Sequence, residues 1–201
     1  APQEIMYDSK PHIGTDILRS VIINMREKIL SFGGEIYYNS LLEDIVIKNG
    51  KVSQVKINGK LIGTDILVLA IGHSARDTFK MLVKNNLNLV SKPFAVGVRI
   101  IHPQDMINEN QYPINYPFLP PASYKLTYKS KSGRGVYSFC MCPGGFVVNA
   151  KSENDSICVN GMSNYKRDTK YANSAIVVTV GPNDYGVNTV SYTHLTLPTK
   201  R

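Results

Sequence analysis

The segment from Leu67 to Thr78, LVLAIGHSARDT, joins an apolar run to side chains that can do chemistry. The run ends at Gly72, which allows the backbone to approach a ligand closely or to adopt a positive φ. The amides of His73 and Ser74 can then face a phosphate. His73 is a candidate acid or base, or a hydrogen-bonding partner of a cofactor, because imidazole titrates near neutral pH. The alternative is a helix cap in which Ser74 caps the helix that follows.

A second pair of candidates lies in the segment KPHIGTD, where His12 and Thr15 come just before a predicted helix. The amino end of a helix can hold an anionic substrate group or a phosphate. His12 is therefore a candidate catalytic residue and Thr15 a candidate anion-binding residue. The alternative is a plain loop that leads into the helix and is stiffened by Pro11.

Arg99 lies in the apolar segment KPFAVGVRI. A guanidinium in such a run should be paired or bind a carboxylate, because burial of an isolated charge is costly. Arg99 is therefore a candidate substrate-binding or anion-binding residue. A salt bridge at a sheet edge is the alternative.

Cys140 and Cys142 are two residues apart in FCMCPGG, so on a regular strand both thiols point to one face. Their Cα atoms would then lie about 6.5 to 7 Å apart, the far limit for a disulfide. Both are candidate redox-active or substrate-contacting thiols, and small buried residues beside a tight turn are the alternative. Cys158 stands alone, so the cysteines lack the spacing of a zinc site and no metal is expected.

A helix is predicted from Thr15, which serves as its N-cap, to the stop at Gly33 and Gly34. Apolar residues recur along it at steps of three and four, which predicts one buried stripe. The stripe consists of Leu18, Val21, Ile22, Met25, Ile29 and Phe32.

Strands are predicted next, first at EIYYN (35–39) and then in two alternating segments joined by Asn49 and Gly50. An Asn-Gly pair between such segments is a strong hairpin signal, and we expect a β-meander of two or three strands. The run DILVLAIG (65–72) is apolar at nearly every position, which favours a strand buried on both faces of a parallel sheet. A helix from about residue 74 to residue 85 should follow.

From Lys92 onward short strand candidates alternate with Pro, Gly and Asn, so the second half is predicted to be mainly β. The expected fold class is α/β, with an incomplete Rossmann-like domain containing the β-meander, followed by a mainly β domain. The predicted boundaries are 1–91 and 92–189. Residues 190–201, VSYTHLTLPTKR, resemble a translated sequencing-adapter tail, and a genuine tail is the alternative.

The 201 residues are 43% apolar and 19% charged, which is typical of a folded domain, and the three cysteines favour thiols in a reducing compartment. Neither a membrane span nor a signal peptide is evident, so a cytoplasmic location is expected. The net charge of +8 is scattered and mainly predicts a solvated surface. Basic and aromatic neighbours in Ser123 to Arg134 leave a non-enzymatic RNA-binding module as an alternative, although no nucleic-acid or membrane partner is expected.

Taken together, six motifs in order resemble the uncharacterised FAD-dependent dehydrogenases among the flavoproteins with the two-dinucleotide-binding fold. The resemblance covers roughly residues 2–185. The motifs are KPHIGTD, LAIGHSARDT, KPFAVGVRI, YSFCMCPGG, NGMS and ANSA.

This resemblance implies that Ala70, Ile71 and Gly72 pack near FAD and that the backbone of Leu42 meets the adenine. It further implies a β-rich domain on the substrate side and two-electron transfer between an unknown small molecule and flavin, with NAD(P) as a candidate electron partner. The Gly-x-Gly-x-x-Gly turn and the acidic residue that binds the ribose are absent from the sequence. We therefore expect an internal fragment of an enzyme that is inactive alone, and an inactive structural fragment is the remaining alternative.

Overall fold

The computed structural model describes residues 3–7, 11–112, 118–152 and 157–185. These residues form two compact units that are discontinuous in sequence. Unit 1 takes the described residues within 1–34 and 93–180, and unit 2 takes those within 35–92 and 181–185. The division into domains at 91 and 92 stays a prediction, and the predicted artefactual tail at 190–201 lies outside the described residues.

Unit 2 contains the predicted β-meander, whose two turns are each made by an Asn-Gly pair. Asn49 and Gly50 have φ values of 51° and 74°, and Asn58 and Gly59 have values of 47° and 79°. Two consecutive positive φ values define the turn whose twist matches that of antiparallel strands. The predicted hairpin is therefore confirmed. The strands are β1 (Leu42–Lys48), β2 (Lys51–Ile57) and β3 (Lys60–Gly63), paired in the order β1-β2-β3.

The helix predicted after the polar segment is also present, as α2 (Arg76–Lys84). Ile45 of β1 packs with Met81 and Leu82 of this helix in the buried cluster of unit 2. The Asn85 amide donates to Asp44 Oδ1 at 2.7 Å, and this bond lowers the pKa of the Asp44 carboxyl. The end of α2 is thus attached to β1 by both apolar packing and a charge-assisted hydrogen bond.

Two predicted strands are wrong. Neither EIYYN (35–39) nor DILVLAIG (65–72) forms a strand, and the second run is largely exposed rather than buried on both faces. Ile66 is 81% exposed to solvent and Val68 is 83% exposed. A strand needs a neighbour for its backbone groups, and the described chain supplies none for either run. Every strand pair in the described chain is antiparallel, so the class is mixed α/β and the Rossmann-like sheet stays a prediction.

The first long helix, α1 (Thr15–Ser31), belongs to unit 1. Its carboxyl end closes as predicted, because Gly33 has a φ of 79° and the Gly34 amide donates to the Ile29 carbonyl at 3.0 Å. This pairing is the Schellman arrangement, which needs a residue with positive φ after the helix. At the other end Gly14, and not Thr15, is the N-cap.

The predicted buried stripe on α1 is wrong, because no residue of the helix is buried among the described residues. Ile22 is 56% exposed and Phe32 is 77% exposed. The spacing of the apolar residues predicts the helix correctly. It does not show whether another part of the described chain covers the apolar face.

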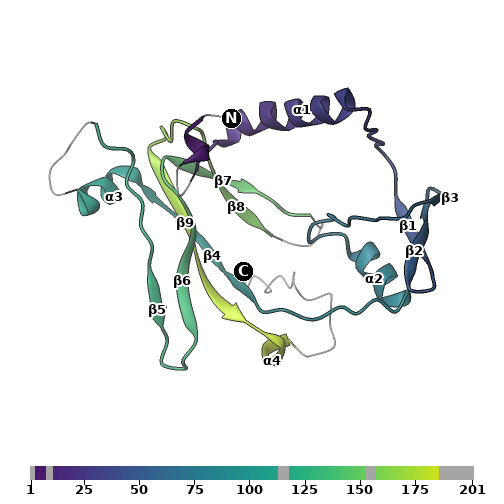
Figure 1. Ribbon diagram of the computed structural model, residues 1–201. Helices are drawn as coiled ribbons and strands as arrows, with labels where there is room; N and C mark the ends of the chain where they lie inside the picture. The colour runs from purple at the N-terminus through teal and green to yellow at the C-terminus, as the bar shows by residue number, and fades with distance from the viewer. Residues whose placement is uncertain (1–2, 8–10, 113–117, 153–156, 186–201) are drawn as a thin grey trace. The chain divides into compact units, whose positions relative to one another are not determined.

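The rest of unit 1 is β-rich, as predicted from Lys92 onward. A four-stranded sheet has the order β4-β9-β6-β5, and its strands run side by side in Figure 1. A two-stranded sheet packs beside it, with β7 against β9 and β8 against β6. The strands are β4 (Phe94–Pro103), β5 (Thr127–Lys129), β6 (Gly135–Cys142), β7 (Gly145–Asn149), β8 (Val159–Ser163) and β9 (Tyr171–Val180).

Three short helices complete the described chain. They are η1 (Gln3–Met6), α3 (Gln104–Gln111) and α4 (Pro182–Tyr185). No helix within the described ranges has the length and apolar character that a bilayer crossing requires.

Candidate functional site

A bulge in β6 shapes the environment of both predicted thiols. Phe139 pairs with Ala175 of β9, whereas the next paired residue, Cys142, lies opposite Asn173, so the register shifts between them. Cys140 in the bulge has a φ of 46°, which a non-glycine residue rarely adopts. The bulge breaks the strand alternation, so the expectation that both thiols share one face of a regular strand is wrong here. Bulges often re-aim groups beside functional sites.

Arg99 of β4 reaches across the sheet to this bulge. Its Nη1 donates to the Cys140 carbonyl at 3.0 Å and to Asn173 Oδ1 at 2.7 Å. Its Nε is buried and has no acceptor among the described residues. Neither of its two acceptors is the expected carboxylate, and the ion pair observed in the described chain, Lys56 with Glu43 at 3.4 Å, is in unit 2.

Besides the His102 ring nitrogen Nδ1, two further buried nitrogens of unit 1 lack a hydrogen-bond partner within the described ranges. They are Asn173 Nδ2 and Arg167 Nε. Asn173 is fully buried, with 0% of its surface exposed, near the amino end of β9. Buried polar groups in folded proteins are nearly always hydrogen-bonded, so three orphaned donors in one unit require an explanation.

Gly161 of β8 lets these groups approach one another. A Cβ atom at this position would overlap Arg99 Nη1 and Asn173 Oδ1 and would lie 2.9 Å from Cys142 Sγ. Any residue other than glycine would therefore displace the guanidinium or the amide. Arg167 joins this group through its positive charge, which acts on the Cys142 thiol. We call the set Arg99, Cys142, Gly161, Arg167 and Asn173 the Arg99 cluster.

The Cys142 thiol donates to the Cys140 carbonyl at 3.3 Å. Burial raises the pKa of this thiol, and the positive charges of Arg99 and Arg167 oppose the rise without cancelling it. Cys142 is thus a protonated thiol at neutral pH, and a catalytic role for either thiol stays a prediction. Cys140, Cys142 and Cys158 are all free, and no group of three potential ligands that could hold a metal is found among the described residues.

His12 and Thr15 lie together at the amino end of α1, where they contact the end of β8 and the residue that follows it. The Thr15 hydroxyl donates to the Ser163 carbonyl at 3.2 Å, and His12 Nε2 lies 2.9 Å from the Asn164 carbonyl oxygen. The Tyr165 amide donates to Asp16 Oδ1 at 2.9 Å and lowers the pKa of that carboxyl. Both predicted residues hold the helix in place, and their roles toward a ligand stay predictions.

The predicted cofactor residues lie in unit 2. Gly72 has the positive φ that the sequence allowed, at 65°, and a Cβ there would meet no atom within 4 Å. His73 and Ser74 are exposed and joined by a 2.7 Å hydrogen bond between Ser74 Oγ and His73 Nδ1. Ala70 is exposed and Ile71 half-buried, while Leu42 starts β1 and packs against the Ile45 cluster. Their contact with FAD stays a prediction.

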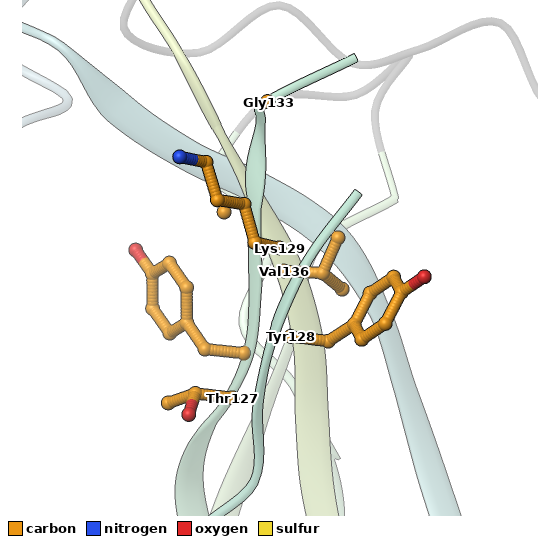
Figure 2. A pocket seen from close by; sticks show the side chains of 7 residues that line it. Thr127, Tyr128, Lys129, Gly133 and Val136 are labelled. Carbon is orange, nitrogen blue, oxygen red and sulfur yellow. The ribbon is translucent and has the colours of Figure 1, made fainter. Parts of the chain in front are cut away.

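A shallow, open hollow of about 410 Å³ lies on the β5–β6 hairpin, within the segment considered for RNA binding and the strand after it. Figure 2 shows Thr127 and Lys129 on one side of β5 and Tyr128 on the other. The lining residues are Thr127, Tyr128, Lys129, Gly133, Gly135, Val136 and Tyr137. None of them is a predicted site residue.

Gly161, Arg167 and Asn173 of the Arg99 cluster were not predicted as site residues from the sequence. Asn173 carried a usable signal, because an Asn inside the apolar strand YANSAIVVTV must find partners when buried. Arg167 carried none, since it follows a lysine in an ordinary polar turn. His102 was also missed, although its Nε2 lies 2.9 Å from the Tyr124 hydroxyl and its Nδ1 is buried without a partner among the described residues.

Comparison with known proteins shows a family and a relative to which this chain is similar. A family model described as "FAD-dependent protein, C-terminal domain-like" matches residues 93–196, a span that contains every member of the Arg99 cluster. A Clostridium beijerinckii protein that carries the name "Uncharacterized protein" is 55% identical over 188 residues. The aligned region is 92% of this chain and 35% of that relative, so the chain spans about a third of the relative's length.

Proposed function

The chain belongs to the family of FAD-dependent proteins, and from this premise we propose that it is a fragment of an FAD-dependent oxidoreductase. The reaction that we propose for the whole protein is two-electron transfer between a small-molecule substrate and flavin. The observation that carries the proposal is the family match over residues 93–196, slightly more than half of the chain. Because the chain spans only about a third of its relative, we expect activity in the whole protein and not in this chain alone.

Residues of this chain would contribute to the flavin-binding site of the whole protein. The flavin supplies the electron chemistry, and the protein supplies position, exclusion of water and proton-handling groups. Gly72 has a positive φ, and no atom lies within 4 Å of the position that a Cβ would take. The amides of His73 and Ser74 follow it directly, a few residues before α2 begins at Arg76. We propose that residues 70–74 and the Leu42 backbone line the FAD and that His73 binds cofactor or handles a proton.

The substrate side of the proposal is placed in the β-rich second half. Residues 92–189 would form the domain that holds the substrate, with Arg99 as its anion-binding residue and NAD(P) as the candidate electron partner. We further propose a cytoplasmic protein whose partner is a small molecule, and neither a nucleic acid nor a membrane.

A spectrum of the full-length Clostridium beijerinckii relative tests the cofactor. We expect the purified protein to show the visible absorption bands of an oxidised flavin and to lose them on reduction with NADH or NADPH under anaerobic conditions. If dithionite bleaches the bands but NADH and NADPH do not, the proposal that FAD is the cofactor stands and the proposal that NAD(P) is the electron partner is contradicted. A colourless protein that takes up no added FAD would overturn the proposed function.

A further inference from the structure

We propose that the Arg99 cluster is a binding site for an oxyanion, either a carboxylate or a phosphate group, that supplies the acceptor for its orphaned donors. The site lies entirely within unit 1, where β4, β6, β8 and β9 meet. Arg99 and Arg167 provide its charge, and the Asn173 amide forms its floor.

The Arg99 cluster contains more hydrogen-bond donors than it has acceptors for. Arg99 and Arg167 each carry a buried Nε without an acceptor among the described residues, and Asn173 adds a third such donor. A buried donor left unsatisfied costs about 1–3 kcal/mol, more for a charged group, so three of them favour a ligand that accepts their hydrogen bonds. The acceptors that Arg99 does have are a carbonyl and an amide oxygen, neither of which carries a charge.

The cluster cannot supply the missing negative charge itself. Cys142 is its one ionisable acid, and its thiol already donates to the Cys140 carbonyl. Burial raises the pKa of that thiol, so it stays protonated at neutral pH in spite of the two arginines. The anion must therefore come from outside the cluster.

The shape of the donors selects the ligand. The Nε and Nη edge of a guanidinium is a planar fork that matches the two oxygens of a carboxylate or a phosphate. Arg99, Cys142, Gly161 and Arg167 are each partly exposed, so the cluster reaches the surface, whereas Asn173 is fully buried beneath it. If the proposed oxidoreductase function holds, on which this assignment of the source rests, a carboxylate would belong to the substrate and a phosphate to the nucleotide.

Thermal unfolding of the chain in acetate or in inorganic phosphate tests the site, with chloride at matched ionic strength as the reference. A ligand that binds the folded state raises the Tm with concentration. We expect acetate or phosphate to raise the Tm beyond the effect of chloride. Arg99→Lys should weaken the binding of the anion about tenfold or more, as expected when a charge-assisted hydrogen bond is lost. Phosphate also stabilises folded proteins without binding a site, so the better ligand is the anion whose effect on the Tm falls more from the wild type to Arg99→Lys. Acetate as the better ligand indicates a carboxylate, and phosphate as the better ligand indicates a phosphate group.

Two more variants keep the test decisive. Arg167→Gln leaves the contact between Arg99 and the bulge intact, so it decides the outcome if Arg99→Lys fails to fold. Arg134→Lys is the matched control, because Arg134 lies in the same unit and donates to the Thr179 carbonyl at 3.1 Å away from the cluster. Its response to both anions should equal that of the wild type.

The proposal is overturned if the three anions act alike on the wild type, or if the cluster variants that fold respond as the wild type does. No FAD is present in these measurements, so they are independent of the proposed function. If the chain binds anions specifically but the relative binds no flavin, the anion site is supported and the oxidoreductase function is contradicted. If the relative binds flavin but the chain shows no specific anion binding, only the anion site is contradicted.

Discussion

Cys142 lies between influences that move its pKa in opposite directions. Burial among β6, β8 and β9 disfavours the thiolate, while the nearby guanidiniums of Arg99 and Arg167 favour it. Burial prevails, so the thiol form dominates at neutral pH. This balance makes Cys142 a weak nucleophile, and the position of its sulfur beside Arg99 can be tested by its reactivity.

We predict that iodoacetamide modifies Cys142 more slowly than the exposed Cys158, because the thiolate is the reacting form. Peptide mass spectrometry after timed labelling at neutral pH measures both rates in one sample. Arg99→Gln should slow the reaction of Cys142 further, since removal of the positive charge raises its pKa. The rate of Cys158 in the same variant is the internal control. Faster labelling of Cys142 than of Cys158 in the wild type would contradict the prediction.

At the scale of elements, the attachment of α1 depends on its first turn. The Asp16 carboxylate accepts from the Tyr165 amide, which lowers its pKa in the folded chain. A lowered carboxyl pKa contributes stability above the unfolded-state value of about 4 and loses it as the pH falls through the folded value. The contact between α1 and the segment after β8 should therefore weaken in acid.

We predict that Asp16→Ala lowers the free energy of unfolding at about pH 7 and has a smaller effect at about pH 3, because part of the stability contributed by the lowered pKa is lost below the unfolded-state pKa of about 4. Urea unfolding followed by circular dichroism at both pH values gives the comparison. Asp77→Ala is the matched control, because Asp77 also lies in the first turn of a helix. An effect of Asp16→Ala that is equally large at both pH values would show that its charge does not matter.

The turn between β1 and β2 gives a second prediction at this scale. Gly50 has a φ of 74° and open space where a Cβ would lie, so Gly50→Ala introduces backbone strain without a clash. We expect a loss of about 1–2 kcal/mol in the free energy of unfolding. Gly63→Ala is the control, since Gly63 also has open space but lacks a positive φ, and its change should stay within about 0.5 kcal/mol. Urea titration of the two variants measures both, and equal losses would contradict the role of φ.

These elements separate what the sequence could predict from what it could not. The Asn49-Gly50 turn and the Gly33-Gly34 stop followed from residues that are adjacent in sequence, because their backbone requirement is local. The run 65–72 was apolar enough to predict a buried strand, but burial needs partners that local sequence does not specify. The Arg99 cluster could be predicted only in part, because it depends on a bulge at Cys140 and on residues brought together from four strands and from the segment between β8 and β9.

At the scale of the whole molecule, the main feature is apolar surface without cover in the described chain. Ile66 and Val68 are each more than four-fifths exposed, and most of the apolar residues of α1 are exposed as well. Monomeric proteins seldom leave large apolar patches open unless the patch meets another surface. A chain that spans about a third of its relative is consistent with cover from the rest of a longer protein.

We predict that Val68→Lys changes the free energy of unfolding of this chain by less than about 0.5 kcal/mol, as for an exposed position. In the full-length protein the same change should cost more, because it would place a charge where the run is covered by apolar atoms. Val55→Lys is the control, since Val55 is 5% exposed in β2 and the substitution should destabilise both proteins. Urea unfolding of the two proteins with each substitution makes the comparison. If Val68→Lys is as harmless in the full-length protein as in this chain, the run 65–72 is a surface segment, and its proposed place beside FAD is lost with it.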